Sequence, residues 1–269
     1  MSLLTFTLRG EPDQRLDLSP LLPQKLAGLS QKEIAAIELQ TTRQRVSVGD
    51  VFKILLGDAS SLRFVGGSSR LDWLGHGMST GSIEMRGDVG AQAGRLMSGG
   101  AIAIFGSAGP FAASGLAGGM LRIEGDAGDY LGAPGPGEMQ GIAGGVVEVL
   151  GNVGERAGER MRRGMLIVGG DAGAYAGARM IAGTLIICGK AGRHPGALMQ
   201  RGTIILGAEP AEMLPGFIDC GPQDLVFTRL LERALAPVNT AAAALLRRPL
   251  RRLAGDMSQL GKGEILLPA

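Results

Sequence analysis

Short runs of alternating apolar residues recur through the middle of the chain, and a glycine opens each run. In the run after Gly164, the second and fourth residues, Leu166 and Val168, are apolar. The opening glycines are Gly81, Gly100, Gly119, Gly145, Gly164, Gly183 and Gly202. They are separated by 19, 19, 26, 19, 19 and 19 residues, and the exception is 19 plus an insertion of 7. A period this regular indicates one structural unit stacked on copies of itself.

Each unit is predicted to form one turn of a coil. A run of about five alternating residues has the length of a strand and is too short for a stable helix. Glycines such as Gly170, Gly173 and Gly177 follow each run and permit the positive φ angles of tight corners. Parallel strands joined by crossovers are strongly biased to right-handed connections. We therefore predict an all-β fold, a right-handed parallel β-helix of about seven 19-residue coils. A first coil that matches the repeat only in part is expected to start at Leu62.

The repeat divides the chain into three predicted regions. Residues 1–60 lack it and are predicted to form a small α+β cap, because the terminal coil of such a stack must hide its unpaired strand edge. Within this cap, Ser30–Ile37 is predicted as a short helix with Ser30 and Glu33 as a capping box. Residues 61–208 are the predicted β-helix.

The third region, residues 209–269, is predicted to be a helical extension. Apolar residues recur at helical spacing through Asp224–Leu235, and Pro237 ends that helix. The stretch Thr240–Leu253 is rich in alanine and leucine, and four arginines surround Pro249 within it. We expect this stretch to continue the helical structure.

The third residue after each opening glycine is predicted to point outward, because side chains alternate along a strand. Read in order, this column is Glu84, Ala103, Arg122, Glu148, Ile167, Ile186 and Ile205. The first four residues of the column are compatible with exposure to solvent. The last three would form an exposed apolar ridge, which a soluble monomer rarely tolerates. Either the chain's own C-terminal helix or a partner subunit covers it, so these isoleucines are candidate partner-binding residues.

Arginines gather on the last coils. They are Arg156, Arg160, Arg162, Arg163, Arg179, Arg193 and Arg201, and several share columns of the repeat. Such a basic side is usually solvated, but it is also a candidate site for an anionic partner or ligand.

Composition excludes several classes of protein. A net charge of +2 and 4% aromatic residues argue against a nucleic-acid partner. Two cysteines provide neither a disulfide framework nor metal-ligand spacing, so a cytoplasmic location is expected. There is no secretory signal pattern, and no apolar run approaches the roughly 20 residues of a membrane span.

Few residues are candidates for chemistry. His76 and His194 could serve a β-helix acyltransferase as a general base, but no second group is seen to orient either ring. Asp88, Asp126 and Asp171 share a column that could hold cations, although capping of turns explains short polar side chains there better. We predict no catalytic residue and no metal site in this chain.

The segment Leu74–Gly90, the 19-residue coils and the N-terminal cap resemble the C-type subunits of two enzyme complexes. One is formylmethanofuran dehydrogenase, and the other is its bacterial counterpart, the formyltransferase/hydrolase complex of methylotrophs. The alanine- and arginine-rich composition favours the bacterial complex over the archaeal tungsten or molybdenum enzyme. The coils are more distantly similar to the C-terminal domain of glutamate synthase. A glutamate synthase-like domain and a stand-alone acyltransferase using His76 or His194 remain alternatives.

The resemblance implies a scaffold role without chemistry in this chain. The A-type subunit of that family is a metal-dependent hydrolase that releases formate, and the D-type subunit transfers the formyl group between tetrahydromethanopterin and a methanofuran-type amine. The B-type and C-type subunits assemble the complex. The implied partners are therefore the A-type, B-type and D-type subunits, with no cofactor bound by this chain. A second hypothesis is that the arginine side holds the polyglutamate tail of the methanofuran-type carrier.

Overall fold

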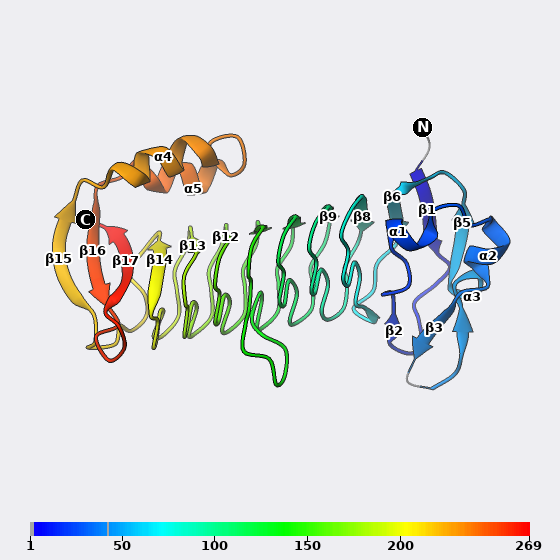
Figure 1. The fold of residues 1–269 in the computed structure, drawn as a ribbon, viewed down its shortest axis with the longest axis horizontal. Coiled ribbons are helices and arrows are strands. Elements are labelled where there is room, and N and C mark those ends of the chain that lie inside the picture. Colours follow the sequence, from blue (N-terminus) through cyan, green and yellow to red (C-terminus); the bar gives the residue numbers. More distant parts are fainter. Residues whose placement is uncertain (1–2, 42) are drawn as a thin grey trace.

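The computed structural model describes residues 3–41 and 43–269, and it shows an elongated stack of coils with a cap at each end (Figure 1). The fold is mostly β. Within the described residues the main sheet has 13 strands in the order β15-β16-β17-β14-β13-β12-β11-β10-β9-β8-β6-β1-β5. The repeat supplies β8 (Ser82–Arg86), β9 (Ala101–Ile104), β10 (Met120–Ile123), β11 (Val146–Val149), β12 (Met165–Val168), β13 (Thr184–Ile187) and β14 (Arg201–Leu206).

Neighbouring strands of the repeat pair in parallel and in register. Leu166 lies opposite Leu185, and Ile167 lies opposite Ile186. Equivalent side chains of successive coils therefore stack in columns. Leu166 and Val168 belong to the main core, whereas Ile167 belongs to a second cluster on the other face of the sheet. The predicted alternation of inward and outward positions is confirmed.

A second column of contacts holds the first corner of each coil. Isolated parallel bridges join small residues of successive coils, such as Ala172 and Ala191. Beside them, short polar side chains accept hydrogen bonds from the backbone N–H of the next coil: Asp88 from Ser107, at 2.7 Å, and Asp171 from Lys190, also at 2.7 Å. These side chains therefore join neighbouring coils, whereas the sequence predicted that they cap their own turns.

The first coil departs from the predicted register. Leu62 on β6 (Asp58–Val65) lies opposite Ile83, which is 21 residues away. At the following corner, Gly75 (φ 70°) and Gly94 (φ 67°) adopt matching conformations 19 residues apart. Two additional residues therefore lie between strand and corner in this coil. The prediction that Leu62 takes the place of an opening glycine is wrong by two positions.

The N-terminal cap packs on β6. Its elements are β1 (Leu3–Leu8), β2 (Leu16–Asp17), α1 (Pro23–Leu26), α2 (Gln31–Ala35), β3 (Glu38–Thr41), β4 (Val46–Ser47), α3 (Val48–Val51) and β5 (Phe52–Leu55), and β2 pairs with β7 (Leu71–Asp72) of the first coil. Phe6, Phe52 and Phe64 form an aromatic cluster, in which the rings of Phe6 and Phe64 stack at 4.9 Å. The capping box of Ser30 and Glu33 is present on α2, as predicted.

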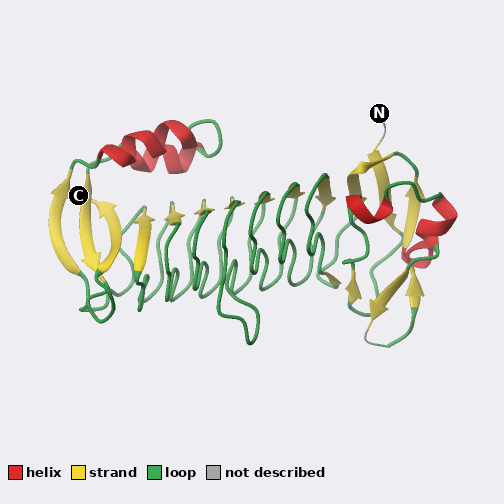
Figure 2. Ribbon diagram, viewed as in Figure 1, coloured by secondary structure: helices red, strands yellow, loops and turns green. Residues whose placement is uncertain are grey.

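The C-terminal region contains both strands and helices (Figure 2). Its elements are β15 (Ile218–Gln223), α4 (Val226–Leu235), α5 (Thr240–Leu246), β16 (Leu250–Gly255) and β17 (Lys262–Pro268). β17 continues the stack in parallel with β14, and β16 returns antiparallel to β17. None of the helices described is long and apolar enough to cross a membrane.

The prediction of a wholly helical extension is therefore wrong over Ile218–Gln223 and beyond Leu246. Pro249 disfavours helical backbone in the residue before it and clashes with the preceding turn. The residues after it pair with β17 along the whole of β16, from Leu250 opposite Pro268 to Gly255 opposite Gly263. Pairing with β17 thus replaces helix over Leu250–Leu253.

Candidate functional site

The helices α4 and α5 lie over the C-terminal coils and cover the isoleucine ridge (Figure 1). Ile167, Ile186 and Ile205 are fully buried. The side chains that bury them are Leu235, Ala242, Ala243, Leu245 and Leu246 of the helices, Leu250 of β16 and Leu266 of β17. The sequence left two alternatives for what covers the ridge, and in the structure the chain's own helices cover it. The three isoleucines therefore do not form an exposed surface for a partner.

Glu148 fastens the helical pair to the sheet. It was expected to face water, but its side chain is fully buried. Asn239 donates a hydrogen bond from Nδ2 to Glu148 Oε1 at 2.9 Å, and Arg122 donates one to Oε2 at 2.7 Å. Asn239 also caps α5, because its Oδ1 accepts a hydrogen bond from the backbone N–H of Ala242. Both carboxylate oxygens thus have donors, one of which arrives with the helices, and this explains the burial of Glu148.

Cys188 lies at the edge of the same buried cluster. Burial, and secondarily the charge of Glu148, raise the pKa of its thiol to about 11. The thiolate is the reactive form of cysteine. The labelling rate of Cys188 should therefore keep rising about tenfold per pH unit from pH 8 to pH 10. Iodoacetamide labelling of a Cys220→Ser variant, followed by mass spectrometry, measures this rate without signal from the exposed Cys220. A rate that levels off near pH 9 would contradict the assignment.

The arginines of the last coils line one side of a groove. A cavity of about 560 Å³ is lined by Met139, Gln140, Arg160, Arg162, Arg179, Ile181, Leu198, Gln200 and Gln259. The 7-residue insertion of the repeat supplies Met139 and Gln140, which form one wall. The lining carries three guanidinium groups, three amides and no carboxylate. This combination suits an anionic ligand, since arginine binds carboxylates and phosphates through paired N–H groups.

Two of these arginines keep their charge available. Arg162 donates a hydrogen bond to Gln140 at 3.2 Å, and Arg160 contacts the sulfur of Met139 at 3.3 Å. Within the described residues neither forms an ion pair. Arg179 is instead paired with Glu159 at 2.9 Å.

The remaining arginines contribute less. Arg156 also pairs with Glu159, at 3.4 Å, and its guanidinium lies over the ring of Tyr175. Arg163, Arg193 and Arg201 are exposed and do not line the groove. The repeat therefore identified Arg160, Arg162 and Arg179 correctly as neighbours. The amides of Gln200 and Gln259 carry no pattern in the sequence that marks them as part of a site.

His76 lies in the first coil, and His194 lies in the coil that Gly183 opens. Burial, and then the positive charge of Arg95, lower the pKa of His76, whose ring meets that of Trp73 edge to face at 4.8 Å. His194 lies 3.8 Å from Glu212. Among the hydrogen bonds of residues 3–41 and 43–269, none joins either ring to a serine, threonine or cysteine side chain. The same residues contain no cluster of three or more side chains suited to hold a metal ion.

Two comparisons with known proteins lead to the same family. No family model matches the chain. The C-type subunit of the formyltransferase/hydrolase complex (Fhc) of Methylorubrum extorquens is 54% identical over 265 residues, which cover 98% of this chain and 99% of that protein. The fold is similar to a chain in the crystal structure of the formyltransferase/hydrolase complex (FhcABCD) from Methylorubrum extorquens in complex with methylofuran. The TM-score is 0.94, with 44% identity and coverage of 98% and 99% of the two chains.

Proposed function

The chain belongs to the family of C-type subunits of the formyltransferase/hydrolase complex, and on that premise we propose that it is a non-catalytic structural component of such a complex. The observation that carries the proposal is the similarity to this family over nearly the whole length of both proteins. The architecture supports it. Polar side chains at the first corner of the coils join successive coils by hydrogen bonds and so help to hold the stack together.

We further propose that the coils form a right-handed parallel β-helix, with residues 1–60 as a cap, 61–208 as the stack and 209–269 as a C-terminal extension. The parallel register of β8 to β14 and the column of parallel bridges support this description. A stack in which each coil contacts only its neighbours is rigid along its axis and presents long flat faces. Such a body suits the assembly of several enzymes around it.

In the proposed complex, the other subunits carry out the chemistry. A D-type subunit transfers the formyl group from tetrahydromethanopterin to a methanofuran-type amine, and an A-type subunit with a bound metal hydrolyses the product to formate. A B-type subunit and this chain hold them together. Purification of the tagged chain at native level, followed by mass spectrometry, should recover A-type and D-type subunits. Recovery of the chain alone would refute the proposal.

The arginine groove is the place on this chain where we propose that the anionic tail of the carrier binds. Arg160 and Arg162 have no carboxylate partner among the residues described, so both are available to an acidic ligand. Changing both to glutamate should weaken carrier binding by the intact complex at least about tenfold, since two positive charges beside the ligand become negative. Arg193→Glu, an exposed change outside the groove, is the matched control. Equal affinity of the double variant and the control would dismiss this part of the proposal.

A further inference from the structure

One ion pair fastens the insertion in the repeat, residues 134–140, to an earlier coil. Glu138 accepts a hydrogen bond from Nη2 of Arg95, which lies two coils nearer the N-terminal cap. Gly135 lies directly against the same guanidinium, because a Cβ on it would be 2.2 Å from Nη1. Its N–H also donates to Glu138 Oε2 at 3.0 Å, which fixes the carboxylate in this position. The insertion thus delivers a carboxylate to Arg95.

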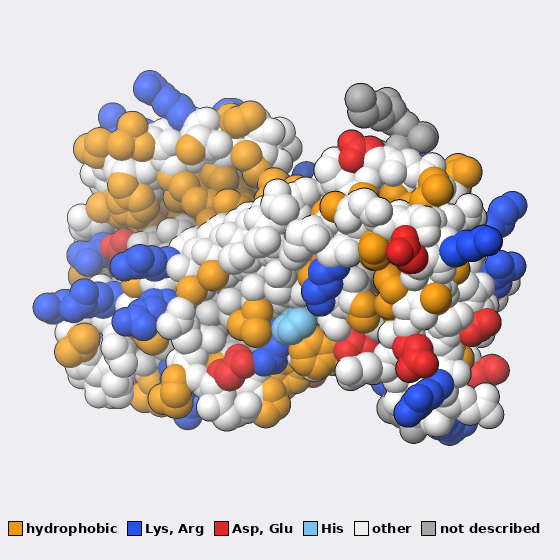
Figure 3. Space-filling view, turned by 45° about the vertical axis from the view of Figure 1, so that its right-hand side comes forward, with side chains coloured by type: hydrophobic (Ala, Val, Ile, Leu, Met, Phe, Trp, Pro, Cys, Tyr) orange, Lys and Arg blue, Asp and Glu red, His pale blue; other side chains and the backbone are white. Residues whose placement is uncertain are grey.

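The guanidinium of Arg95 is oriented by neighbours outside the insertion. It lies over the ring of Trp73 at 5.4 Å, and the ring of His76 meets that of Trp73 edge to face. Gln92 Oε1 accepts a hydrogen bond from Nη1 at 3.3 Å. Figure 3 shows hydrophobic, basic and histidine side chains side by side at the surface where the stack meets the N-terminal cap. We call the surroundings of this guanidinium the Arg95 recess, and its own coils give it its shape.

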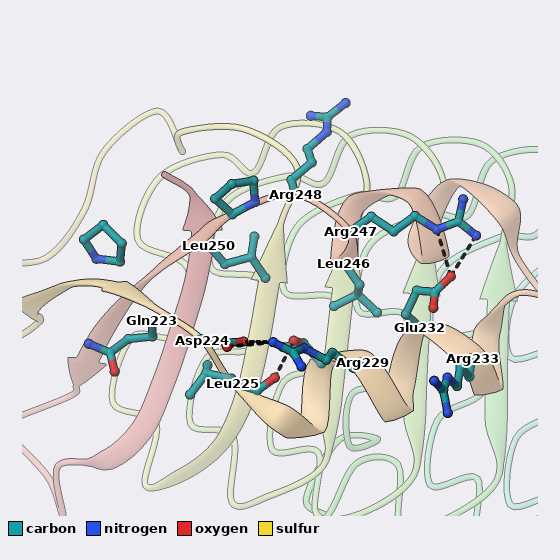
Figure 4. A pocket seen from close by; sticks show the side chains of 13 residues that line it. Gln223, Asp224, Leu225, Arg229, Glu232, Arg233, Leu246, Arg247, Arg248 and Leu250 are labelled. Carbon is teal, nitrogen blue, oxygen red and sulfur yellow. Dashed lines mark hydrogen bonds and ion pairs between the residues drawn. The ribbon is translucent and has the colours of Figure 1, made fainter.

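The pair in the recess differs from the exposed pairs of this chain. Beside the cavity of about 670 Å³ between α4 and residues 247–250, Arg229 pairs with Asp224 (Figure 4), and their side chains are 68% and 77% exposed. Such a pair contributes little, since water solvates both charges. The side chain of Arg95 is only 13% exposed. A guanidinium with so little access to water needs an acceptor, and a carboxylate matches its fork of N–H groups.

Glu138 does not use all the hydrogen-bonding groups of the recess. Arg95 Nε, Ser114 Oγ and His76 Nδ1 are buried and form no hydrogen bond with the described residues. These residues are spaced by 19 and occupy one column of successive coils, and Ser114 is fully buried. Arginine Nε–H and serine O–H both donate to carboxylate oxygens. Since buried polar atoms almost always have partners, the column indicates a ligand with more acceptors than Glu138 supplies.

The recess lies on the same edge of the stack as the arginine groove. Arg95 and Glu159 occupy the same position of the repeat once the insertion is counted, and Glu159 directly precedes Arg160 of the groove. Met139 of the insertion lines the groove, whereas Glu138 reaches into the recess. The insertion therefore separates two arginine sites, of which one is open and the other is filled by the insertion's own carboxylate.

We propose that the Arg95 recess is a second carboxylate site for the acidic ligand of the groove, and that Glu138 occupies it as an internal competitor. This inference rests on the proposed function, because the ligand is the anionic tail proposed for the groove. A ligand with several carboxylates that reaches across the insertion places one of them on Arg95 in exchange for Glu138. The ion pair is retained in this exchange, and new hydrogen bonds from Arg95 Nε and Ser114 Oγ favour the ligand. Binding in the groove raises the effective concentration of the next carboxylate at the recess, so long acids displace Glu138 and short ones do not.

Trp73 is the single tryptophan of the chain, so its fluorescence reports on the recess directly. Titration of the full chain with hexaglutamate should change this emission as Glu138 leaves Arg95. Glu138→Gln should lower the concentration at half-saturation at least about fivefold, because no internal carboxylate then competes. Glu155→Gln removes the same charge from an exposed position that does not line the groove, and it should match the native chain. Circular dichroism of each variant checks that the fold is retained.

A double variant distinguishes binding at the recess from a general effect of charge. The gain from Glu138→Gln should disappear when Arg95→Gln is added, because the recess then has no guanidinium to receive the ligand. A gain that persists without Arg95 would overturn the inference. Equal affinities of Glu138→Gln and Glu155→Gln would overturn it as well.

Calorimetry with the same hexaglutamate distinguishes the recess from the groove. Binding that is lost when Arg160 and Arg162 are both changed to glutamate, but that leaves the emission of Trp73 unchanged in the native chain, would overturn this inference alone. The proposed function would then stand. Absence of any binding to the native chain would refute the groove and the recess together.

Discussion

Replacement of Ile186 by alanine should lower the free energy of unfolding of the isolated chain by about 2–5 kcal/mol, the range for removing a large aliphatic side chain from a packed core. Ile186 is the middle residue of the ridge and is fully buried beneath α4 and α5. The neighbouring isoleucines are held in register by the sheet and cannot move to fill the space. Urea denaturation followed by circular dichroism measures the change.

Leu230→Ala is the control for this measurement. It also shortens an aliphatic side chain on the helical pair, but Leu230 is exposed, so the free energy of unfolding should change by less than about 0.5 kcal/mol. Equal and small effects of the two changes would mean that the helices do not rest on the ridge in solution. The isoleucines would then be open to a partner, which is the other interpretation that the sequence allows.

Replacement of Gly164 by alanine should destabilise the chain by more than about 3 kcal/mol, because two penalties add. Gly164 has a φ of 82°, which L-residues avoid, and a Cβ there would lie 2.6 Å from the carbonyl oxygen of Gly145 in the preceding coil. That oxygen accepts the hydrogen bond of Met165, so it cannot retreat without opening the stack.

A substitution at Gly137 distinguishes the penalty of backbone strain from the penalty of the steric clash. This glycine lies in the insertion and has nearly the same φ, 81°, but a Cβ there would meet no atom within 4 Å. Gly137→Ala should therefore cost only about 1 kcal/mol, the strain of the backbone alone. Thermal or urea unfolding of both variants gives the comparison. If Gly164→Ala proves no worse than Gly137→Ala, the close approach of successive coils is not what requires glycine at the opening position.

The repeat made the middle of the fold predictable. Glycines at fixed intervals indicate where the chain turns a corner and how closely successive coils approach. The alternation of Leu166, Ile167 and Val168 indicates which side chains face inward. Both signals are local and recur seven times, so one unusual coil does not obscure them. The same reasoning brought Arg160 and Arg179 together correctly, because a shared column is a direct consequence of the period.

What the repeat could not predict depends on contacts between segments far apart in the sequence. Glu148 looks like a surface residue in its column, and only Asn239, 91 residues later, makes it a buried acceptor. Leu250–Gly255 has the composition of a helix end, but β17 offers it a strand to pair with. Local propensity is a weak guide where a tertiary partner of this kind exists.

The two ends of the main sheet differ from its middle. β5 runs antiparallel to β1, and β16 runs antiparallel to β17, so neither end presents a further coil of the repeat. Pro222 on the outermost strand, β15, has no N–H to offer a neighbour. A second molecule therefore meets no matching coil on which to continue the parallel stack, and this works against growth into a fibre. Each coil of the repeat therefore adds about 4.8 Å to the distance between the two ends of the molecule. Addition or loss of one coil would change that distance in a single step and leave both caps intact.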